Sequence, residues 1–580
     1  MTKSYSKYRG RIKLLAFSII LSWLFICFRL FHVQVLSGQH YQQKVIKQAQ
    51  RKENLPAIRG NIFDRNKKPL SRNIIHYTLS VNPADVRNKV ELADALSKIT
   101  GKSKEVYLKK INSKSKFEYL ERNLQKDELG ALHTASFKGL NIERKYRRYY
   151  PHNHIAAQLV GYTDLDDEGI SGIEKDYNSY LKGNEGWIYK TKGWSGKVQR
   201  KNGLPFKMPI AGNNIQLTID LEYQSILEQE LQNRQRETDA LSATGIIMDP
   251  ETGHILAMAS TPGFNNNNFD KASQELHRIK SITDQFEPGS TYKIVSVISA
   301  LNTNQVNVRS EFNCENGIYE YHSIKIEDYG KDNGYGMLTL PQVIQFSSNI
   351  GIVKMIEKIR PKTLYATARD FGFGSKTGIT LNGEVPGKLR PYNSWSSISP
   401  GQIAMGHEVG VTALQLATAY CAIANGGYLL KPRIINQIID QDNRVIYKEE
   451  PLVVRKISDK RTINSLKKML RGVIIEGTGR KADIIGWKVA GKTGTAQKWK
   501  EGKYSDNQFI SNFVGFFPYE KPQLLGLILI DEPKQPYHWG SEGAAVTFNR
   551  VMQRIISMDD NIQPPLKVHL ENNGEDQINL

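Results

Sequence analysis

Three short motifs of this chain hold the residue types needed to activate a serine hydroxyl, and the first surrounds Ser290. Ser290 stands three residues before Lys293, in the segment FEPGSTYK, where an apolar helix is predicted to begin. Residues three apart lie on one face of a helix, so the lysine amine can reach the serine hydroxyl. A serine hydroxyl is a poor nucleophile until a base removes its proton, and a desolvated lysine with a lowered pKa can be that base. We therefore predict Ser290 as a nucleophile and Lys293 as its base.

The spacing Ser-x-x-Lys is weak evidence by itself. It occurs five times in this chain, beginning at Ser4, Ser113, Ser179, Ser290 and Ser465. Only the copy at Ser290 follows Pro-Gly and opens an apolar helix. The amino terminus of a helix also offers free backbone N–H groups and a positive dipole end beside a developing oxyanion. The sequence context, rather than the spacing, therefore selects Ser290.

The second motif is Ser347-Ser348-Asn349, which precedes the helical run Ile350–Met355. Ser and Asn are favoured at the amino-terminal caps of helices, so the motif taken alone predicts a helix cap.

The third motif is Lys492-Thr493-Gly494-Thr495, which follows a strand-like segment. On a strand, Thr493 and Thr495 point the same way, Lys492 points the opposite way, and Gly494 lets another backbone approach closely. Two hydroxyls and a nearby ammonium suit the binding of a peptide carboxylate. A second Lys-Thr-Gly, at 376–378, lies in a Gly-rich turn, and we assign it a structural role only.

The order of the three motifs is that of the serine enzymes that recognise penicillin. Five other segments of the chain resemble those of the class B penicillin-binding proteins, the monofunctional DD-transpeptidases of bacterial peptidoglycan. Arg59–Asn66 resembles the RGxIxDRN box of the family's pedestal, and Gly169–Glu174 resembles its GxxGxE box. Trp395-Ser396, Met405–His407 and Val411–Leu416 are similar to the division-specific branch, the FtsI or penicillin-binding protein 3 type. Tyr537–Ala545 departs from the family's Tyr-Gly-Gly-x-x-Ala-Ala pattern, on the side of the acceptor.

The resemblance implies a role for each motif residue. Ser290 would attack a D-Ala-D-Ala stem peptide with Lys293 as base, and the N–H groups of Ser290 and Thr495 would hold the oxyanion. Ser347, near Lys492, would relay a proton to the leaving amine. The substrate-binding residues would be Asn349, Thr493, Gly494 and Thr495. The resemblance implies no metal and no organic cofactor, and it implies covalent inhibition by β-lactams.

An amino-terminal membrane anchor is predicted from the first 52 residues, which contain no Asp or Glu. Five basic residues precede an apolar stretch from Leu14 to Leu36, long enough for about 30 Å of hydrocarbon. A cleaved signal peptide is the alternative, but no A-x-A-like site follows the stretch. The basic residues predict a cytoplasmic amino terminus and a single-pass protein of the cytoplasmic membrane, with the catalytic part outside.

The composition excludes several classes of protein. Hydrophobic residues at 39%, 46 Gly, 22 Pro and 3 Cys exclude a polytopic membrane protein and a collagen-like, disordered or disulfide-framework chain. The net charge of +21 raises the possibility of an anionic partner, but the export placement and the interleaved acids argue against nucleic acid. Cys27 lies in the anchor, and nothing in the sequence favours a Cys314–Cys421 bridge.

The predicted fold class is α+β. Two strand pairs, Gly245–Met248 with His254–Met258 and Asn512–Phe517 with Leu524–Ile530, enclose helices predicted at Tyr292–Leu301, Ile350–Ile359 and Val411–Ala424. The resemblance makes this a β-lactamase-like domain, with a central antiparallel sheet flanked by helices. We divide the chain into a cytoplasmic tail (1–13), an anchor (14–36), an elongated pedestal (37–212), a transpeptidase domain (213–558) and a loose tail (559–580).

The family resemblance predicts septal cross-linking of stem peptides, with a SEDS-type (FtsW-like) glycosyltransferase and other division proteins as partners. Elongation-type and sporulation-type transpeptidases are alternatives within the family. A β-lactamase or β-lactam sensor is less favoured, because the chain has a pedestal and no Glu-x-x-Leu-Asn segment to position a hydrolytic water. A silent scaffold is disfavoured by the intact Ser290 and Lys293.

Overall fold

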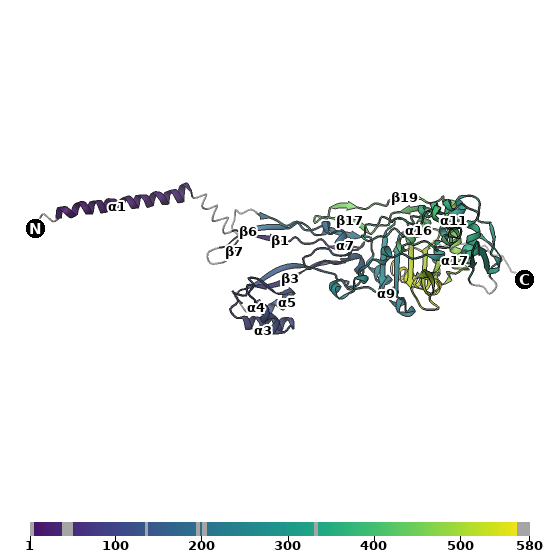
Figure 1. The fold of residues 1–580 in the computed structure, drawn as a ribbon, viewed down its shortest axis with the longest axis horizontal. Helices are drawn as coiled ribbons and strands as arrows, with labels where there is room; N and C mark the ends of the chain where they lie inside the picture. Colours follow the sequence, from purple (N-terminus) through teal and green to yellow (C-terminus); the bar gives the residue numbers. More distant parts are fainter. Residues whose placement is uncertain are drawn as a thin grey trace. The chain divides into compact units, whose positions relative to one another are not determined.

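The computed structural model describes residues 5–37, 50–133, 137, 139–192, 198–199, 206–329, 334–500 and 502–564. The chain forms two compact units, one from residues 1–58 and 183–211 and the other from residues 59–182 and 212–580 (Figure 1).

The first unit contains the predicted anchor. Helix α1 (Tyr5–Phe31) continues into one π-helical turn, η1 (His32–Leu36), and has no acidic residue in its first turn. Residues Tyr8–Leu36 form a helical span of 29 residues, long enough to cross a bilayer, and a stretch of 18 residues within it has a mean hydropathy of 2.3. The helix begins within the basic segment that was expected to be a tail. The same unit holds strand β6 (Gly186–Lys192), which pairs antiparallel with β1 (Gln50–Leu55), β7 (Val198–Gln199) and β8 (Phe206–Lys207).

The second unit begins with a small three-stranded sheet of order β4-β3-β5 (Glu118–Leu124, Arg72–Val81 and Leu140–Tyr149). Helices α3 (Lys89–Thr100), α4 (Lys104–Ile111) and α5 (Lys126–His133) complete this subdomain. Its own apolar core includes Leu79, Leu92, Leu96 and Tyr107, all fully buried.

A buried ion network holds the strands of this part to the GxxGxE segment. The carboxylate of Glu174 accepts from Arg59 Nε at 2.7 Å and from Arg148 Nε at 2.6 Å. Side-chain exposure is 0% for Arg59 and Glu174 and 1% for Arg148. Arg59 also donates to the carbonyls of Asp167 and Glu174. The Arg59–Asn66 and Gly169–Glu174 segments therefore meet in one charge cluster, in which two guanidinium groups share the single carboxylate of Glu174.

We expect Glu174→Gln to lower the free energy of unfolding by about 3–5 kcal/mol, because it leaves two buried guanidinium groups without their shared counter-charge. Denaturant and thermal unfolding of the detergent-solubilised protein would measure this loss. Glu222→Gln is the matched control, because its ion pair with Lys68 is 48% and 44% exposed and should contribute less than about 1 kcal/mol. Equal losses in the two variants would contradict the expectation.

A four-stranded sheet joins the start of the second unit to its later segments. Its order is β18-β17-β9-β2 (Val445–Lys448, Ile435–Ile439, Asn214–Leu217 and Ile62–Phe63), with β2 parallel to β9. Ile62 and Ile215 pair in this sheet and are both fully buried.

The main sheet has five antiparallel strands in the order β11-β10-β22-β21-β20. These strands are β10 (Ser242–Met248), β11 (Ile255–Thr261), β20 (Ala490–Lys500), β21 (Lys503–Phe517) and β22 (Leu524–Asp531). Strands from the two ends of the domain therefore lie side by side, as the α+β prediction required. Consecutive residues of β21, such as Phe513 and Val514, belong to different apolar clusters, because successive side chains of a strand point to opposite faces of the sheet.

Helices cover both faces of the main sheet (Figure 1). On one face lie α9 (Leu221–Thr238) and α18 (Ala544–Met558), and on the other lie α11 (Lys293–Asn302), α16 (Ala413–Ala424) and α17 (Lys460–Ile475). Thr412 and Gln415 form a capping box, so α16 starts at Ala413, two residues later than the predicted Val411. The remaining elements are α6 (Ala157–Val160), α7 (Gly172–Asp176), α8 (Asn178–Leu181), α10 (Lys280–Thr283), α12 (Leu340–Gln345), α13 (Asn349–Ile356), α14 (Pro361–Asp370), α15 (Ser399–Met405), β12 (Glu311–Asn313), β13 (Ile318–Tyr321), β14 (Ile324–Glu327), β15 (Met337–Thr339), β16 (Tyr428–Leu430), β19 (Val453–Lys456) and short 3₁₀ turns.

Two sequence predictions differ from the structure at element ends. The helix predicted over Ile350–Ile359 ends at Ile356, because Pro361 opens α14 and the residue before a proline is driven out of the helical region, as Arg360 is (φ −76°, ψ 140°). The tail predicted from residue 559 begins with packed residues, since Tyr223 Oη donates to Asp559 and Ile562 is buried. Residues 565–580 of that tail lie outside the described residues.

Candidate active site

Ser290 lies in a 3₁₀ turn, η4 (Gly289–Tyr292), that leads directly into α11. Residues three apart eclipse one another in a 3₁₀ turn, so Ser290 and the first residue of α11, Lys293, lie on one face. Gly289 has φ +56°, and a Cβ at this position would lie 2.7 Å from the carbonyl oxygen of Thr495. A glycine is therefore required where the turn packs against strand β20.

The amine of Lys293 is buried among oxygen atoms of the Ser347–Asn349 segment. Lys293 Nζ donates to the Ser347 carbonyl at 2.7 Å, to Asn349 Oδ1 at 2.8 Å and to Ser347 Oγ at 3.3 Å. The residue has an exposed fraction of 0%. The turn that carries the second motif thus surrounds the amine that the first motif provides.

Ser347 links all three motifs through one hydroxyl. Its Oγ donates to Ser290 Oγ at 2.9 Å and accepts from Lys492 Nζ at 2.9 Å as well as from Lys293. The backbone of Ser347 is left-handed, with φ 63°, which is uncommon for a residue with a side chain. This strained turn between α12 and α13 aims the hydroxyl at the two lysines instead of continuing the helix.

The predicted contact between Ser290 and Lys293 is indirect in this structure. Among the hydrogen bonds of the described residues, none joins Lys293 Nζ to Ser290 Oγ, and Ser347 Oγ bridges the two residues instead. The physical reason is that the carbonyl of Ser347 and the amide of Asn349 are stronger acceptors for the amine than a serine hydroxyl. The three-residue spacing therefore brings Ser290 and Lys293 to one face of the helix start, whereas the Ser347–Asn349 turn determines which hydrogen bonds the lysine makes.

Burial lowers the pKa of both lysines. Desolvation lowers the pKa of Lys293 to about 7, and the negative charge of Asp328 is the main influence that opposes this shift. Desolvation first, and the positive charge of Lys293 second, hold the pKa of Lys492 well below its usual range. Two ammonium groups around one hydroxyl repel each other in a low dielectric, so the site favours a neutral amine near neutral pH.

Both the oxygen and the nitrogen of the Asn349 side-chain amide form hydrogen bonds. Its Oδ1 accepts from Lys293, and its Nδ2 donates to the carbonyl of Glu327 at 3.0 Å. Ser348 is the helix cap that the sequence predicted for this motif, since its Oγ accepts from Gly351 N at 2.9 Å. The segment is therefore both a cap, through Ser348, and part of the site, through Ser347 and Asn349.

Strand β20 carries the third motif at the edge of the main sheet. Lys492 is buried and points to Ser347, while the hydroxyl of Thr493 contacts that of Thr478 at 2.7 Å. Thr495 Oγ1 accepts from Gly540 N at 3.0 Å, which leaves its own O–H free to donate. A Cβ at Gly494 would lie 2.5 Å from Asn512 Oδ1 and 2.7 Å from the Pro288 carbonyl, so only glycine fits there.

The second Lys-Thr-Gly, at 376–378, has its polar groups occupied elsewhere. Glu384 accepts from Thr377 N and Thr377 Oγ1 at 2.6 and 2.5 Å and from Gly378 N at 3.2 Å. Glu384 therefore stabilises the 376–378 turn through these hydrogen bonds, in agreement with the structural role expected for the turn.

Asp328 is a residue of this site that sequence reasoning did not find. Its carboxylate accepts from Asn349 N at 2.5 Å, from Ile350 N at 3.1 Å and from Ser348 Oγ at 2.6 Å. It thus caps α13 from another element, the end of the β13–β14 hairpin. A lone Asp after a short strand carries no sequence signal, because its partners lie about twenty residues away. Thr478 and Gly540, which contact the two threonines of β20, were missed for the same reason.

Cys314 lies in the same region and is a free, buried thiol. Ser348 Oγ lies 3.3 Å from its sulfur, and Cys421 is also free and buried, beside Met248. The two thiols therefore do not pair.

We expect Asp328→Asn to slow acylation of Ser290 about tenfold and to shift the acid limb of the rate to lower pH. The amide loses charge-assisted hydrogen bonds to α13, and removing a negative charge lowers the pKa of Lys293 further. The pH profile of labelling by a fluorescent penicillin measures both effects. Glu327→Gln is the control, since it makes the same charge change on a neighbouring, half-exposed side chain paired with Lys325. A merely structural role for Asp328 would slow labelling without moving the acid limb.

With this geometry in view, comparison with known proteins gives two matches to family models. Residues 243–553 match the penicillin-binding protein transpeptidase domain, and residues 54–217 match the penicillin-binding protein dimerisation domain. The chain belongs to the class B penicillin-binding proteins. This confirms the predicted family, the α+β fold class and a serine-type transpeptidase.

The relatives of this class B protein carry several names. It is 30% identical to stage V sporulation protein D of Bacillus subtilis, with 93% of this chain and 84% of the relative covered. It is 29% identical to the peptidoglycan D,D-transpeptidase FtsI of Escherichia coli, with 96% and 92% covered. The amino-terminal apolar helix is consistent with a membrane anchor in such a protein.

Solved structures show the same fold. Penicillin-binding protein 3 of Mycobacterium tuberculosis, complexed with aztreonam, matches with a TM-score of 0.68 at 23% identity, covering 89% of this chain and 98% of that one. Penicillin-binding protein 2X of Streptococcus thermophilus matches with a TM-score of 0.73 at 23% identity, covering 88% and 80%.

Proposed function

We propose that this class B transpeptidase cross-links peptidoglycan stem peptides through an acyl-enzyme on Ser290, in septal wall synthesis. The observation that carries the proposal is the single hydroxyl of Ser347, which contacts Ser290, Lys293 and Lys492. A nucleophile, a candidate base with a pKa of about 7 and a proton relay thus lie within one hydrogen-bonded group.

In the first step, Ser290 Oγ attacks the carbonyl of the penultimate D-Ala while its proton passes to Lys293. The resulting oxyanion would be held by the N–H groups of Ser290 and Thr495, each such donor contributing about 3 kcal/mol. The C–N bond to the terminal D-Ala then breaks. Ser347 gives its proton to the leaving amine and regains one from Lys293, 3.3 Å away, so that the net transfer is from Ser290 to D-Ala.

The donor peptide would lie along the outer edge of β20. Among the strands that the structure describes, β20 is the last of its sheet and pairs only with β21, so its other edge is open to an added strand. The hydroxyl of Thr495, oriented by Gly540, and that of Thr493 would bind the terminal carboxylate. Asn349, held by Lys293 and Glu327, would hold a peptide amide.

In the second half-reaction, an amine of a neighbouring stem peptide attacks the acyl-enzyme. A new amide bond forms, the ester bond to Ser290 breaks, and the proton of the amine returns to Ser290 through the same group. The motif residues supply every proton transfer in this scheme. The proposed chemistry therefore uses no metal and no organic cofactor.

Acylation of Ser290 by a penicillin should follow the protonation state of Lys293. Its pKa of about 7 means that the amine is mainly protonated below pH 7 and cannot accept the proton of Ser290. We expect the second-order labelling rate to fall about tenfold per pH unit well below pH 7 and to level off above about pH 8. Stopped-flow measurements with a fluorescent penicillin, with protein stability checked at each pH, would test this. A profile that is flat from pH 5.5 to 8.5 would exclude Lys293 as a base with this pKa.

Substitution of the nucleophile gives the sharpest test of the site. We expect Ser290→Ala to abolish covalent labelling by a fluorescent penicillin while leaving the thermal midpoint close to that of the wild type. Ser465→Ala is a matched control, because Ser465 opens another Ser-x-x-Lys but is a half-buried residue of α17 whose hydroxyl donates to the Arg461 carbonyl of the same helix.

Labelling of the Ser290→Ala protein would refute the assignment of the nucleophile. A persistent adduct in the wild type supports a transpeptidase, rapid turnover of the adduct would support a β-lactamase, and no adduct would support a non-catalytic scaffold.

The proposal places the catalytic unit outside the cytoplasmic membrane. The basic residues before the apolar stretch support a cytoplasmic amino terminus and a single span. We propose a SEDS-type glycosyltransferase and other division proteins as partners, on the strength of the family resemblance and of the relative named FtsI.

The septal role rests on the resemblance to the division-specific branch, whereas one relative is named for sporulation. Depletion of the protein in its own cells distinguishes septal, side-wall and sporulation roles. Filamentous cells would support septal synthesis, round cells would support a side-wall role, and a defect confined to spores would support a sporulation role.

A further inference from the structure

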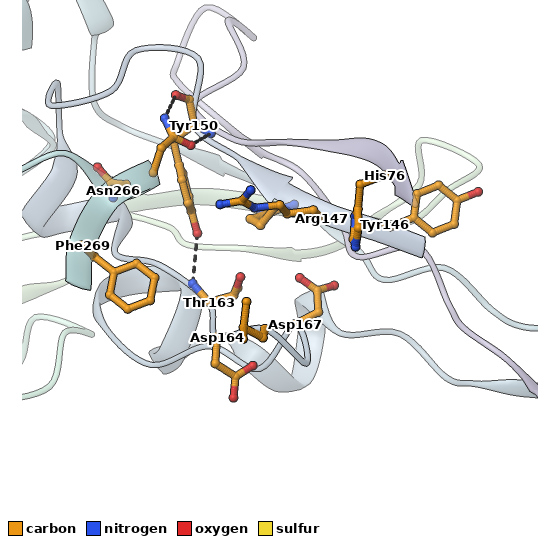
Figure 2. Close-up of a pocket in the computed structure, with 12 residues that line it drawn as sticks. His76, Tyr146, Arg147, Tyr150, Thr163, Asp164, Asp167, Asn266 and Phe269 are labelled. Carbon is orange, nitrogen blue, oxygen red and sulfur yellow. Dashed lines mark hydrogen bonds between the residues drawn. The ribbon is translucent and has the colours of Figure 1, made fainter. Parts of the chain in front are cut away.

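A partly open cavity of about 60 Å³ lies away from the three motifs, in the pedestal region of the second unit (Figure 2). Its walls come from β3 and β5, from the loop at 163–167 and from the 3₁₀ turn η2 (Asn266–Lys271) of the following domain. Tyr150 crosses the view in Figure 2, with its hydroxyl accepting from Thr163 N at 3.1 Å, and Asp167 and Asn266 stand on different sides of it.

Two charges of opposite sign, the buried Arg148 and the half-buried Asp167, line this cavity without a hydrogen bond to each other among the described residues. Arg148 uses its Nε for Glu174 and its Nη1 for Asn73, whereas its Nη2 is buried and has no hydrogen-bond partner among the described residues. Asp167 Oδ1 is likewise buried and, within the described part of the chain, unpartnered. Burial raises the pKa of Asp167 to about 6, with Arg148 and Arg59 opposing the shift, so this carboxyl is still mainly ionised at neutral pH.

Asn266 adds a third unmatched atom, an acceptor. Its Nδ2 donates to the carbonyls of Ala157 and Gly161, which fixes the amide with Oδ1 on the other side. This Oδ1 is buried and finds no partner in the described residues, and the residue has an exposed fraction of 2%. Leaving such groups bare costs free energy, so an occupant is expected on the Asp167 side of Tyr150 that accepts from Arg148 and donates to Asp167, and a separate donor is expected at Asn266.

The size and charge of the cavity narrow the kind of occupant. One buried water needs about 10–15 Å³ of such space, so a volume of about 60 Å³ takes several waters or one molecule of about six non-hydrogen atoms. The exposed Arg147 lies on the rim beside Arg148, and Asp164 lies beside Asp167, so the charged groups of the wall balance. A neutral wall with separated positive and negative ends suits a small molecule that is itself dipolar.

We propose that this cavity binds a small zwitterion of the α-amino acid class. Its carboxylate would accept from Arg148 Nη2, and its ammonium would donate to Asp167 Oδ1. The ligand would then join β5, which carries Arg148, to the loop at 163–167, which carries Asp167. A cluster of ordered waters is the competing occupant.

D-Alanine is the natural probe, and its choice rests on the proposed function, because transpeptidation releases it beside the same molecule. The full-length protein in detergent is first acylated with penicillin, which blocks the catalytic site. Binding of isotope-labelled D-alanine, glycine and propionate is then measured by equilibrium dialysis. We expect saturable binding of both amino acids and at least about tenfold weaker binding of propionate, which lacks the ammonium.

The variant Asp167→Asn tests the assignment to this cavity. Asp167 has φ 65°, and Asn adopts this left-handed conformation as readily, so the backbone and the bond from Arg59 to its carbonyl should be kept. We expect at least a tenfold loss of D-alanine affinity. Asp166→Asn is the matched control, because it makes the same charge change on the next residue, which is exposed and does not line the cavity.

Penicillin labelling keeps the two proposals apart. Both Asp167→Asn and Asp166→Asn should be labelled by penicillin at the wild-type rate, so a failure of labelling would concern the Ser290 site and not the cavity. Binding of D-alanine is also measured on unacylated Ser290→Ala protein, so the test of the cavity does not depend on acylation. Absence of saturable binding, equal affinity in Asp167→Asn and wild type, or water alone in this cavity in crystals grown with D-alanine would each overturn the amino acid site.

Discussion

The catalytic unit depends on one hydroxyl, that of Ser347, which is shared by two buried lysine amines and the proposed nucleophile Ser290. Bringing two amines to one point in a low-dielectric interior is unfavourable while both carry a charge, and this lowers their pKa values. The same constraint that makes the pocket costly to fold therefore provides a neutral amine near neutral pH. Fold stability and chemistry are opposed here, as is common at sites that activate a nucleophile.

The rest of the domain holds that hydroxyl in place. Strand β20 lies at the edge of a five-stranded sheet, so Lys492 is fixed by strand pairing while the outer edge stays open. The left-handed Ser347 turn leads directly into α13, whose first backbone N–H groups are held by the carboxylate of Asp328 from a separate hairpin. Glycines at 289 and 494 let the nucleophile turn and β20 approach within contact of each other.

The pedestal region depends on the same kind of balance between burial and charge. Glu174 neutralises Arg59 and Arg148 inside the protein, and the hydrogen bonds of this network tie the two sequence boxes together. The match is incomplete, because Arg148 Nη2 and Asp167 Oδ1, on the wall of a cavity, have no hydrogen-bond partner among the residues that the structure describes. Buried polar groups are rarely left in this state, which is why the cavity is the second place in this molecule where a ligand is expected.

The sequence by itself determined the local features of this protein. These were the apolar span, the two hairpins whose strands became β10, β11, β21 and β22, the start of α11 after Pro-Gly, and the order of three motifs, because each depends on neighbours within a few residues. Only the tertiary structure decided which groups meet. It placed Ser347 between Ser290 and Lys293, brought Asp328 to the cap of α13, and left Arg148 and Asp167 facing one cavity. Contacts across tens or hundreds of residues are set by how the sheets and helices pack, and a hydrogen bond formed in that way leaves no spacing in the sequence to be recognised.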